Sequence, residues 1–201
     1  PYTTLFRSSD GHWIKMKPEY SDQTSHIDCL IIGAYYGDGR RRSNLLSHFL
    51  VGVSDHTSLQ QGKGKQSEPM DVTKTRWMTM GKVGTGYTLA ELRILNEKLA
   101  PNVIPYTRPK DYKSRAAANA KGSSSSSASS AWPKWLAPWN MAVDDVPDVF
   151  VPPDKSFVLE IKCAELHKTN QFSANFTPRF PRCVNIRYDK NWWEAITAKE
   201  L

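Results

Sequence analysis

Alternating apolar and polar positions mark residues 157–163 (FVLEIKC) as a half-buried β-strand. Leu159 and Ile161 would line one face of this strand, whereas Glu160 and Lys162 would point from the other face. Further alternating or β-rich apolar segments predict strands at Trp13–Lys17, Ile27–Tyr36, Ser47–Val53, Arg76–Val83 and Cys183–Arg187.

One segment has the period of an α-helix instead. Thr88 and Glu91 have the spacing of a capping box, in which each side chain accepts a hydrogen bond from the other residue's backbone N–H. Leu92, Leu95 and Leu99 follow at helical spacing, before a proline. After residue 20 the order is therefore three strands, a helix and two strands. This order predicts an all-β fold with one helix, the Greek-key β-barrel called the OB fold, which often binds nucleic acids.

Two stretches do not belong to this pattern. Residues 113–131 (KSRAAANAKGSSSSSASSA) cannot bury enough apolar surface to offset the entropy of ordering, so we expect a disordered surface insertion there. Residues 1–8 (PYTTLFRS) can be reverse-translated into a sequencing adapter, so we expect them to be a non-native leader.

Composition narrows the class of partner. The 201 residues carry a formal net charge of +7 with a pI near 9.3, which favours a polyanion such as nucleic acid or nucleotide phosphates. Cys29, Cys163 and Cys183 are far apart in the sequence, so we expect reduced thiols and no disulfide framework. No run approaches the roughly 18 apolar residues of a membrane span, so we expect no membrane partner.

Two basic groups in the first quarter of the chain are candidates for phosphate contacts. Lys15 and Lys17 lie two apart on a predicted strand, so both ammonium groups would project from one face about 7 Å apart. Arg40, Arg41 and Arg42 follow a glycine turn and could meet a nucleic-acid backbone. In both cases an ordinary solvated surface explains the same residues.

A denser group of charges lies near the end of the sequence. Arg179 and Arg182 are followed closely by Arg187, Asp189 and Lys190. Arginine offers a planar fork that matches phosphate oxygens, lysine offers a point charge, and the aspartate between them could orient either cation. The alternative interpretation is a surface salt-bridge cluster that contributes little to stability.

Short segments along the chain, in order, resemble eukaryotic ATP-dependent DNA ligases. They are Trp13–Tyr20 (WIKMKPEY), Asp28–Gly33 (DCLIIG), Val83–Thr88 (VGTGYT), Pro147–Phe150 (PDVF), Glu160–Glu165 (EIKCAE) and Arg179–Arg182 (RFPR). The first of them and the DKNW sequence at 189–192 are most similar to the end-joining ligase of that family. The resemblance implies that residues 9–20 form the last strand of an adenylation (nucleotidyltransferase) domain and that residues 21–201 form the OB-fold domain.

The resemblance also implies a function. Such ligases use ATP and Mg²⁺ to seal DNA strand breaks through lysyl-AMP and DNA-adenylate, and the end-joining member repairs double-strand breaks in the nucleus. Lys15 and Lys17 match the motif that contacts the α-phosphate of ATP. Arg187, Asp189 and Lys190 match the R-x-D-K motif that closes over the β- and γ-phosphates.

The same family assigns phosphate or DNA-backbone binding to Arg179 and Arg182, and DNA as the partner of the whole domain. Pro178 stands where these ligases usually carry an apolar strand residue, so we expect it to kink that strand. The 201 residues contain no K-x-D-G motif, so we expect the chain to lack the nucleophilic lysine and to be inactive alone.

By the same resemblance, the carboxylates that bind Mg²⁺ and the region that binds the end-joining scaffold protein lie outside this chain. Two other interpretations stay open. One is a nucleotidyltransferase domain of the mRNA capping type. The other is a non-catalytic OB-fold module that binds nucleic acid by stacking and charge.

Overall fold

The computed structural model describes residues 5–7, 13–15, 26–37, 45–55, 75–106, 132–138 and 146–201, the first two segments as backbone only. Several predictions fall outside these residues, namely Lys17, the arginines at 40–42, the insertion at 113–131 and the side chain of Lys15. A strand predicted at Trp13–Lys17 is confirmed over β2 (Trp13–Lys15), which pairs antiparallel with β1 (Leu5–Arg7) in a separate two-stranded sheet.

The main sheet holds the five other predicted strands. Along it the order is β11–β8–β3–β4–β5, and all neighbours are antiparallel. The bounds are β3 His26–Tyr36, β4 Leu46–Asp55, β5 Arg76–Val83, β8 Val158–Lys162 and β11 Arg182–Arg187. Two short strands extend this sheet beside β3, β6 (Ile104–Pro105) and β7 (Val149–Phe150).

Backbone hydrogen bonds close the sheet into a barrel, because the segment after β5 meets the start of β11. The N–H of Cys183 donates to the carbonyl of Thr85 at 2.9 Å, and the hydroxyl of Thr85 donates to the carbonyl of Pro181 at 3.2 Å. Gly86, with φ of +101°, permits this approach, since a Cβ on it would lie 2.0 Å from the carbonyl oxygen of Cys183. Strand order and closure together confirm the OB fold.

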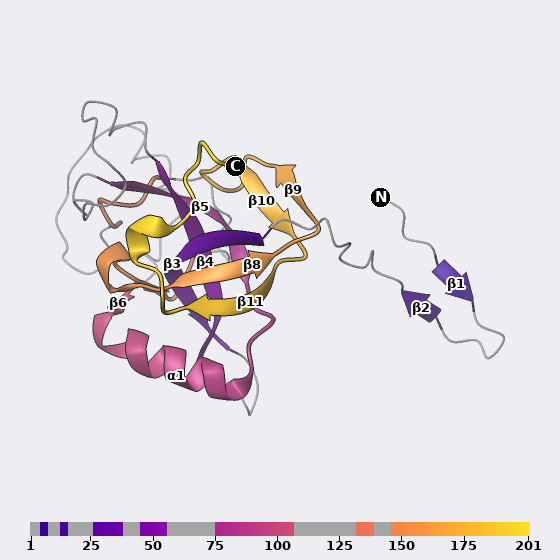
Figure 1. The fold of residues 1–201 in the computed structure, drawn as a ribbon, viewed down its shortest axis with the longest axis horizontal. Coiled ribbons are helices and arrows are strands. Elements are labelled where there is room, and N and C mark those ends of the chain that lie inside the picture. The colour runs from indigo at the N-terminus through magenta and orange to yellow at the C-terminus, as the bar shows by residue number, and fades with distance from the viewer. Residues whose placement is uncertain are drawn as a thin grey trace, which may run out of the picture.

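The α-helix of the described residues, α1 (Leu89–Leu99), lies across one end of the barrel (Figure 1). It begins with the predicted capping box, in which the N–H of Glu91 donates to Thr88 Oγ1 at 3.2 Å and the N–H of Thr88 donates to Glu91 Oε2 at 2.7 Å. These bonds lower the pKa of Glu91. The predicted leucines Leu92, Leu95 and Leu99 are buried, and a 3-10 turn at Ala100–Asn102 ends the helix.

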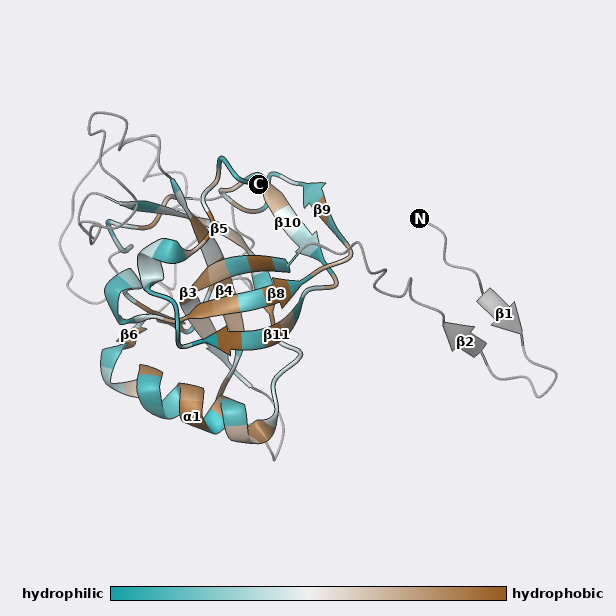
Figure 2. Cartoon of the chain, viewed as in Figure 1, coloured by the Kyte–Doolittle hydropathy of each residue, from teal (hydrophilic) through white to brown (hydrophobic). Residues whose placement is uncertain are grey.

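Apolar side chains form two core clusters, one on each face of the sheet. The inner cluster fills the barrel and includes Cys29, Ile31, Phe49, Leu95 and Leu159. The outer cluster includes Leu30, Trp77, Leu136, Phe150 and Val158, and the segments 132–138 and 192–195 cover it. Brown segments in Figure 2 mark the hydrophobic residues of these strands. The outer face of β3 and β8 is therefore buried at one end and exposed at the other.

One hairpin was not predicted, and one expectation was wrong. Strands β9 (Glu165–Lys168) and β10 (Phe176–Arg179) form a second two-stranded sheet. The expected kink at Pro178 does not occur, because the pairing register continues without a shift through Pro178, opposite Leu166. A ring without an N–H is tolerated there because β10 is at the edge of a two-stranded sheet.

Candidate functional site

The R-x-D-K residues lie at the end of β11, where the strand leaves the barrel. A turn follows it, closed by the N–H of Lys190, which donates to the carbonyl of Arg187 at 3.3 Å. Within this turn the guanidinium of Arg187 meets the carboxylate of Asp189 side by side, with Nε to Oδ1 at 2.9 Å and Nη2 to Oδ2 at 2.7 Å. Two parallel charge-assisted bonds of this kind fix both position and orientation of the guanidinium.

A carboxylate from another strand joins the two cations. Lys190 Nζ donates to Oδ2 of Asp28, and Arg187 Nη1 lies 3.5 Å from the same oxygen. Asp28 is on the outward face of β3, between the buried Ile27 and Cys29. The N–H of Ile196 donates to the backbone carbonyl of Asp28 at 2.8 Å, which holds the final segment of the chain against β3.

Glu160 and His26 complete the cluster. In the antiparallel register Asp28 is opposite Glu160, which is opposite Asn185, so these three residues form one row across β3, β8 and β11. Glu160 Oε2 lies 4.0 Å from Arg187 Nη1, and Glu160 Oε1 lies 2.6 Å from Nδ1 of His26. Glu160 therefore links the cluster to the exposed end of the sheet.

In this cluster the carboxylates outnumber the cations. Two cations, Arg187 and Lys190, face the three carboxylates of Asp28, Glu160 and Asp189, a formal net charge of −1 with His26 neutral. Hydrogen bonding to Arg187 lowers the pKa of Asp189 to about 2, and the pair raises the pKa of Arg187 in turn. The Arg187–Asp189 pair therefore stays ionised across the physiological range.

Geometry shows what the two cations could hold. Arg187 Nη1 and Lys190 Nζ face one anionic oxygen, Oδ2 of Asp28, while Asp189 takes up the fork of Arg187, so their positions suit an oxyanion that contacts one guanidinium nitrogen and one ammonium group. The Asp28 carboxylate occupies the place of such an oxyanion. The donor set consequently fits a phosphate oxygen.

A second group of cations lies beyond this cluster, around the turn between β10 and β11. Arg179 Nη1 donates to Glu165 Oε1 at 2.9 Å, and His167 Nε2 lies 2.7 Å from the same oxygen. The His167 contact and then the Arg179 contact lower the pKa of Glu165. Arg182 is exposed at the start of β11.

Strand register gives Arg182 two basic neighbours. His26 is opposite Lys162, and Lys162 is opposite Arg182, so the three form a row across β3, β8 and β11. Adjacent strands are about 4.8 Å apart, so this basic row presents closely spaced donors on the outer face of the barrel. We call His26, Lys162 and Arg182 the basic row.

The structure brings some of the predicted residues together and separates others. Arg187, Asp189 and Lys190 form one cluster, whereas Arg179 and Arg182 lie beyond it at the β10–β11 turn. Of the described residues with a place in either group, the sequence reasoning missed Asp28, Glu160, His26, Lys162, Glu165 and His167. Their signal was the pairing register of β3, β8 and β11 and of β9 with β10, which the sequence pattern alone does not give.

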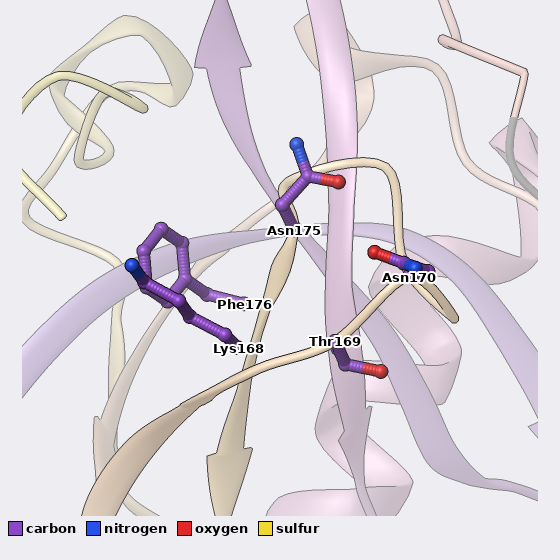
Figure 3. A pocket seen from close by; sticks show the side chains of 5 residues that line it. All are labelled: Lys168, Thr169, Asn170, Asn175 and Phe176. Carbon is purple, nitrogen blue, oxygen red and sulfur yellow. The ribbon is translucent and has the colours of Figure 1, made fainter.

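The loop between β9 and β10 carries a hollow of about 620 Å³, lined by Lys168, Thr169, Asn170, Asn175 and Phe176. Figure 3 shows the Lys168 and Phe176 side chains beside each other, with Asn170 and Asn175 on the turn. None of the predicted site residues lines this hollow.

Neither a metal site nor a membrane-spanning helix is present in the described part of the chain. Within the described residues, no group of three or more His, Cys, Asp or Glu side chains is placed to hold a metal ion. No helix in the same part of the chain is long and apolar enough to cross a membrane.

Comparison with known proteins defines the class. Residues 42–190 match the family described as "ATP dependent DNA ligase C terminal region", which covers the barrel strands from β4 to the R-x-D-K turn. The chain therefore belongs to the ATP-dependent DNA ligase family, as its motifs predict.

Within that family the most similar curated proteins include DNA ligase 4. The chain is 30% identical to DNA ligase 4 of Gallus gallus over 191 residues, which cover 94% of this chain and 17% of that protein. It is 30% identical to the protein from Homo sapiens and 31% identical to that from Arabidopsis thaliana, over 94% of this chain and 17% and 13% of theirs. The chain thus spans about a sixth of the length of these relatives.

Among solved structures, similarity extends to the ligase domain of LigD from M. tuberculosis. The sequence identity is 19% and the TM-score 0.48, over 92% of this chain and 40% of that chain. A mycobacterial DNA ligase D complexed with ATP and MES gives 18% and 0.45 over the same shares.

Proposed function

We propose that this chain is the OB-fold portion of an end-joining DNA ligase, which seals DNA breaks by nucleotidyl transfer from ATP. The observation that carries the proposal is the convergence of Arg187 and Lys190 on one carboxylate oxygen of Asp28. The family match and the similarity to DNA ligase 4 from many eukaryotes support it.

In this proposal the R-x-D-K turn binds the β- and γ-phosphates of ATP. Arg187 supplies its Nη1 group and Lys190 the point charge, while Asp189 takes up the fork of Arg187, orients it and does not touch the nucleotide. Donors held against the phosphates in this way stabilise the negative charge that develops as pyrophosphate leaves. Lys15 and Lys17 would hold the α-phosphate, and they stay a prediction from the family motif.

DNA is the second partner in the proposal. The exposed Arg182 and the rest of the basic row would contact phosphates of the duplex backbone, and Arg179 would do so after exchange of its bond to Glu165. Such contacts give affinity without sequence readout. The arginines at 40–42 would add to them, again as a prediction from sequence.

Further properties follow from the relatives and belong to the proposal alone. They are action in the nucleus, double-strand break repair by non-homologous end joining, use of Mg²⁺, and recruitment by a scaffold protein through a region outside these 201 residues. Because the 201 residues hold no K-x-D-G motif, we also propose that the chain is inactive without an adenylation domain that supplies the nucleophilic lysine.

Self-adenylation with labelled ATP tests the phosphate role. In a full-length ligase that carries this chain, Lys190→Ala removes one of the proposed donors to the β- and γ-phosphates of ATP. We expect adenylation to fall by about tenfold to a hundredfold while the fold is kept. The matched control is Lys199→Ala, an exposed lysine outside the cluster, which should leave adenylation unchanged. Normal label transfer by the Lys190 variant would remove the basis of the assignment.

A further inference from the structure

Asp28 is an unusual member of the cluster, because its two carboxylate oxygens are treated differently. Oδ2 receives Lys190 and lies near Arg187, whereas Oδ1 is buried and has no hydrogen-bond partner among the residues that the structure describes. A buried carboxylate oxygen without a donor is destabilising, because its lost hydration is not replaced. The fold therefore holds Asp28 against the two cations at some cost in stability.

The two cations differ in how firmly their carboxylate partners are held. Asp189 contacts Arg187 through two parallel bonds and belongs to the same turn, so it stays with Arg187. Lys190 is different, since within the described part of the chain its ammonium group contacts Asp28 alone and the lysine stem is flexible. Lys190 is thus the cation that can change partner without unfolding the turn.

We propose that Asp28 occupies the place of a phosphate oxygen in the free chain and that a phosphate must displace it from Lys190 to bind. The inference rests on the proposed function, because it takes the R-x-D-K turn as the phosphate site. Asp28 is then a positioning residue: it keeps both cations converged on one point, and it competes with the ligand for them.

Electrostatics decides the sign of its effect. With Asp28 ionised, the cluster carries a formal net charge of −1 and repels an approaching polyphosphate. Replacing Asp28 by Asn removes one negative charge, leaves a neutral side chain of similar shape, and frees Lys190. Phosphate affinity should therefore rise, whereas a residue that merely braced the site would give a fall.

A titration of the 201-residue chain with inorganic tripolyphosphate at low salt tests this. We expect Asp28→Asn to bind about threefold to tenfold more tightly than the unmodified chain. Asp28→Glu keeps the charge and should stay near the original affinity. Asp154→Asn is the matched control, since Asp154 lies outside the cluster, with the exposed Lys155 at 3.8 Å, and it should change nothing.

A spectroscopic readout makes the result independent of whether the variant folds. In the unmodified chain, saturating tripolyphosphate should shift the side-chain carboxyl carbon resonance of Asp28 and the ¹⁵N resonance of the Lys190 ammonium group together, because their bond breaks. Unchanged Asp28 and Lys190 resonances at saturation, or equal or weaker binding by a folded Asp28→Asn chain, would overturn the inference.

Two further variants separate this inference from the proposed function. If Lys190→Ala lowers tripolyphosphate binding but Asp28→Asn does not raise it, the phosphate role of Lys190 stands and the competition by Asp28 fails. The gain from Asp28→Asn should disappear in the Asp28→Asn, Lys190→Ala double variant, and a gain that persists there would also overturn the inference. Parallel titrations with ATP and with a nicked duplex show whether nucleotide or DNA phosphates exploit the release.

Discussion

Asp189 orients the guanidinium of Arg187 and so determines the geometry of the site. Its carboxylate forms two parallel bonds with the Arg187 guanidinium, two residues earlier on the same turn. A guanidinium on a flexible stem loses rotamer freedom when it binds a ligand, and here much of that loss has occurred in the free chain. Asp189 therefore preorganises Arg187.

The protonation of Asp189 gives a test of this pair. Its pKa falls to about 2 from an ordinary value of 3.8, so the pair stabilises the fold fully above pH 3.8 and loses this contribution as the pH falls toward 2. We expect Asp189→Asn to lower the melting temperature slightly and equally between pH 5 and 8, with the difference vanishing near pH 2. Thermal unfolding followed by circular dichroism measures it.

The outcome against this pairing is specific. A difference between the Asp189→Asn and unmodified chains that persists at pH 2, or that is confined to pH 6–8, would point to some other role of Asp189. Asp154→Asn provides the reference for an exposed carboxylate whose lysine partner is 3.8 Å away.

Local spacing was enough to predict half of the cluster. Arg187, Asp189 and Lys190 are neighbours in sequence, so their charges and the family motif identify them directly. Asp28 and Glu160 come from strands far apart in the chain, and only the register of β3 against β8 brings them to one row. A shift of one residue in that register would leave the two carboxylates on opposite faces of the sheet.

At the scale of elements, the sequence predicted those strands and the helix that bury one face in the core, because such elements have a regular hydrophobic pattern. The alternation in β8 and the leucine spacing in α1 exist because each element buries one face in the barrel. The β9–β10 hairpin has no such face: most of its residues are exposed or half-buried, and each strand is only four residues long. Backbone pairing and contacts with β5 hold the hairpin in place, and neither produces a hydrophobic period in the sequence.

Helix α1 provides a paired test of this account. Leu95 is fully buried in the inner core, whereas its neighbour Ile94 is 48% exposed. We expect Leu95→Ala to lower the free energy of unfolding by about 2–5 kcal/mol, because it leaves a cavity, and Ile94→Ala to lower it by well under 1 kcal/mol. Urea denaturation of the two variants measures both values. Equal losses would mean that α1 does not pack on the barrel as described.

At the scale of the whole molecule, the question is which surface carries the excess of basic side chains behind the net charge of +7. The R-x-D-K cluster contributes none of it, since its own net charge is −1. Among the described residues, Arg182 and Lys162 of the basic row and Lys168 on the hairpin lie on the outer surface instead. We therefore expect a polyanion to be attracted to the β8–β11 and β9–β10 surface rather than to the cluster.

Binding of a nicked duplex by the 201-residue chain should consequently depend on salt. We expect log Kd to rise linearly with log salt concentration, and Arg182→Gln to reduce that slope by about 0.9 as one phosphate contact is lost. Lys155→Gln, which removes a lysine already paired with Asp154, serves as the control and should leave the slope unchanged. A slope that is flat, or equal for the two variants, would exclude Arg182 from the DNA interface. Fluorescence anisotropy at several salt concentrations measures it.

Closure of the barrel has a consequence for how the protein reaches its native state. The strand that completes the barrel through Cys183 and Thr85 is the strand that ends in Arg187, and its partner row includes Asp28 from the first barrel strand. Pairings between such distant segments form late and slowly in folding. We therefore expect Arg187 and Lys190 to meet Asp28 only once β11 has joined the barrel, so that closure of the barrel and assembly of the cluster coincide.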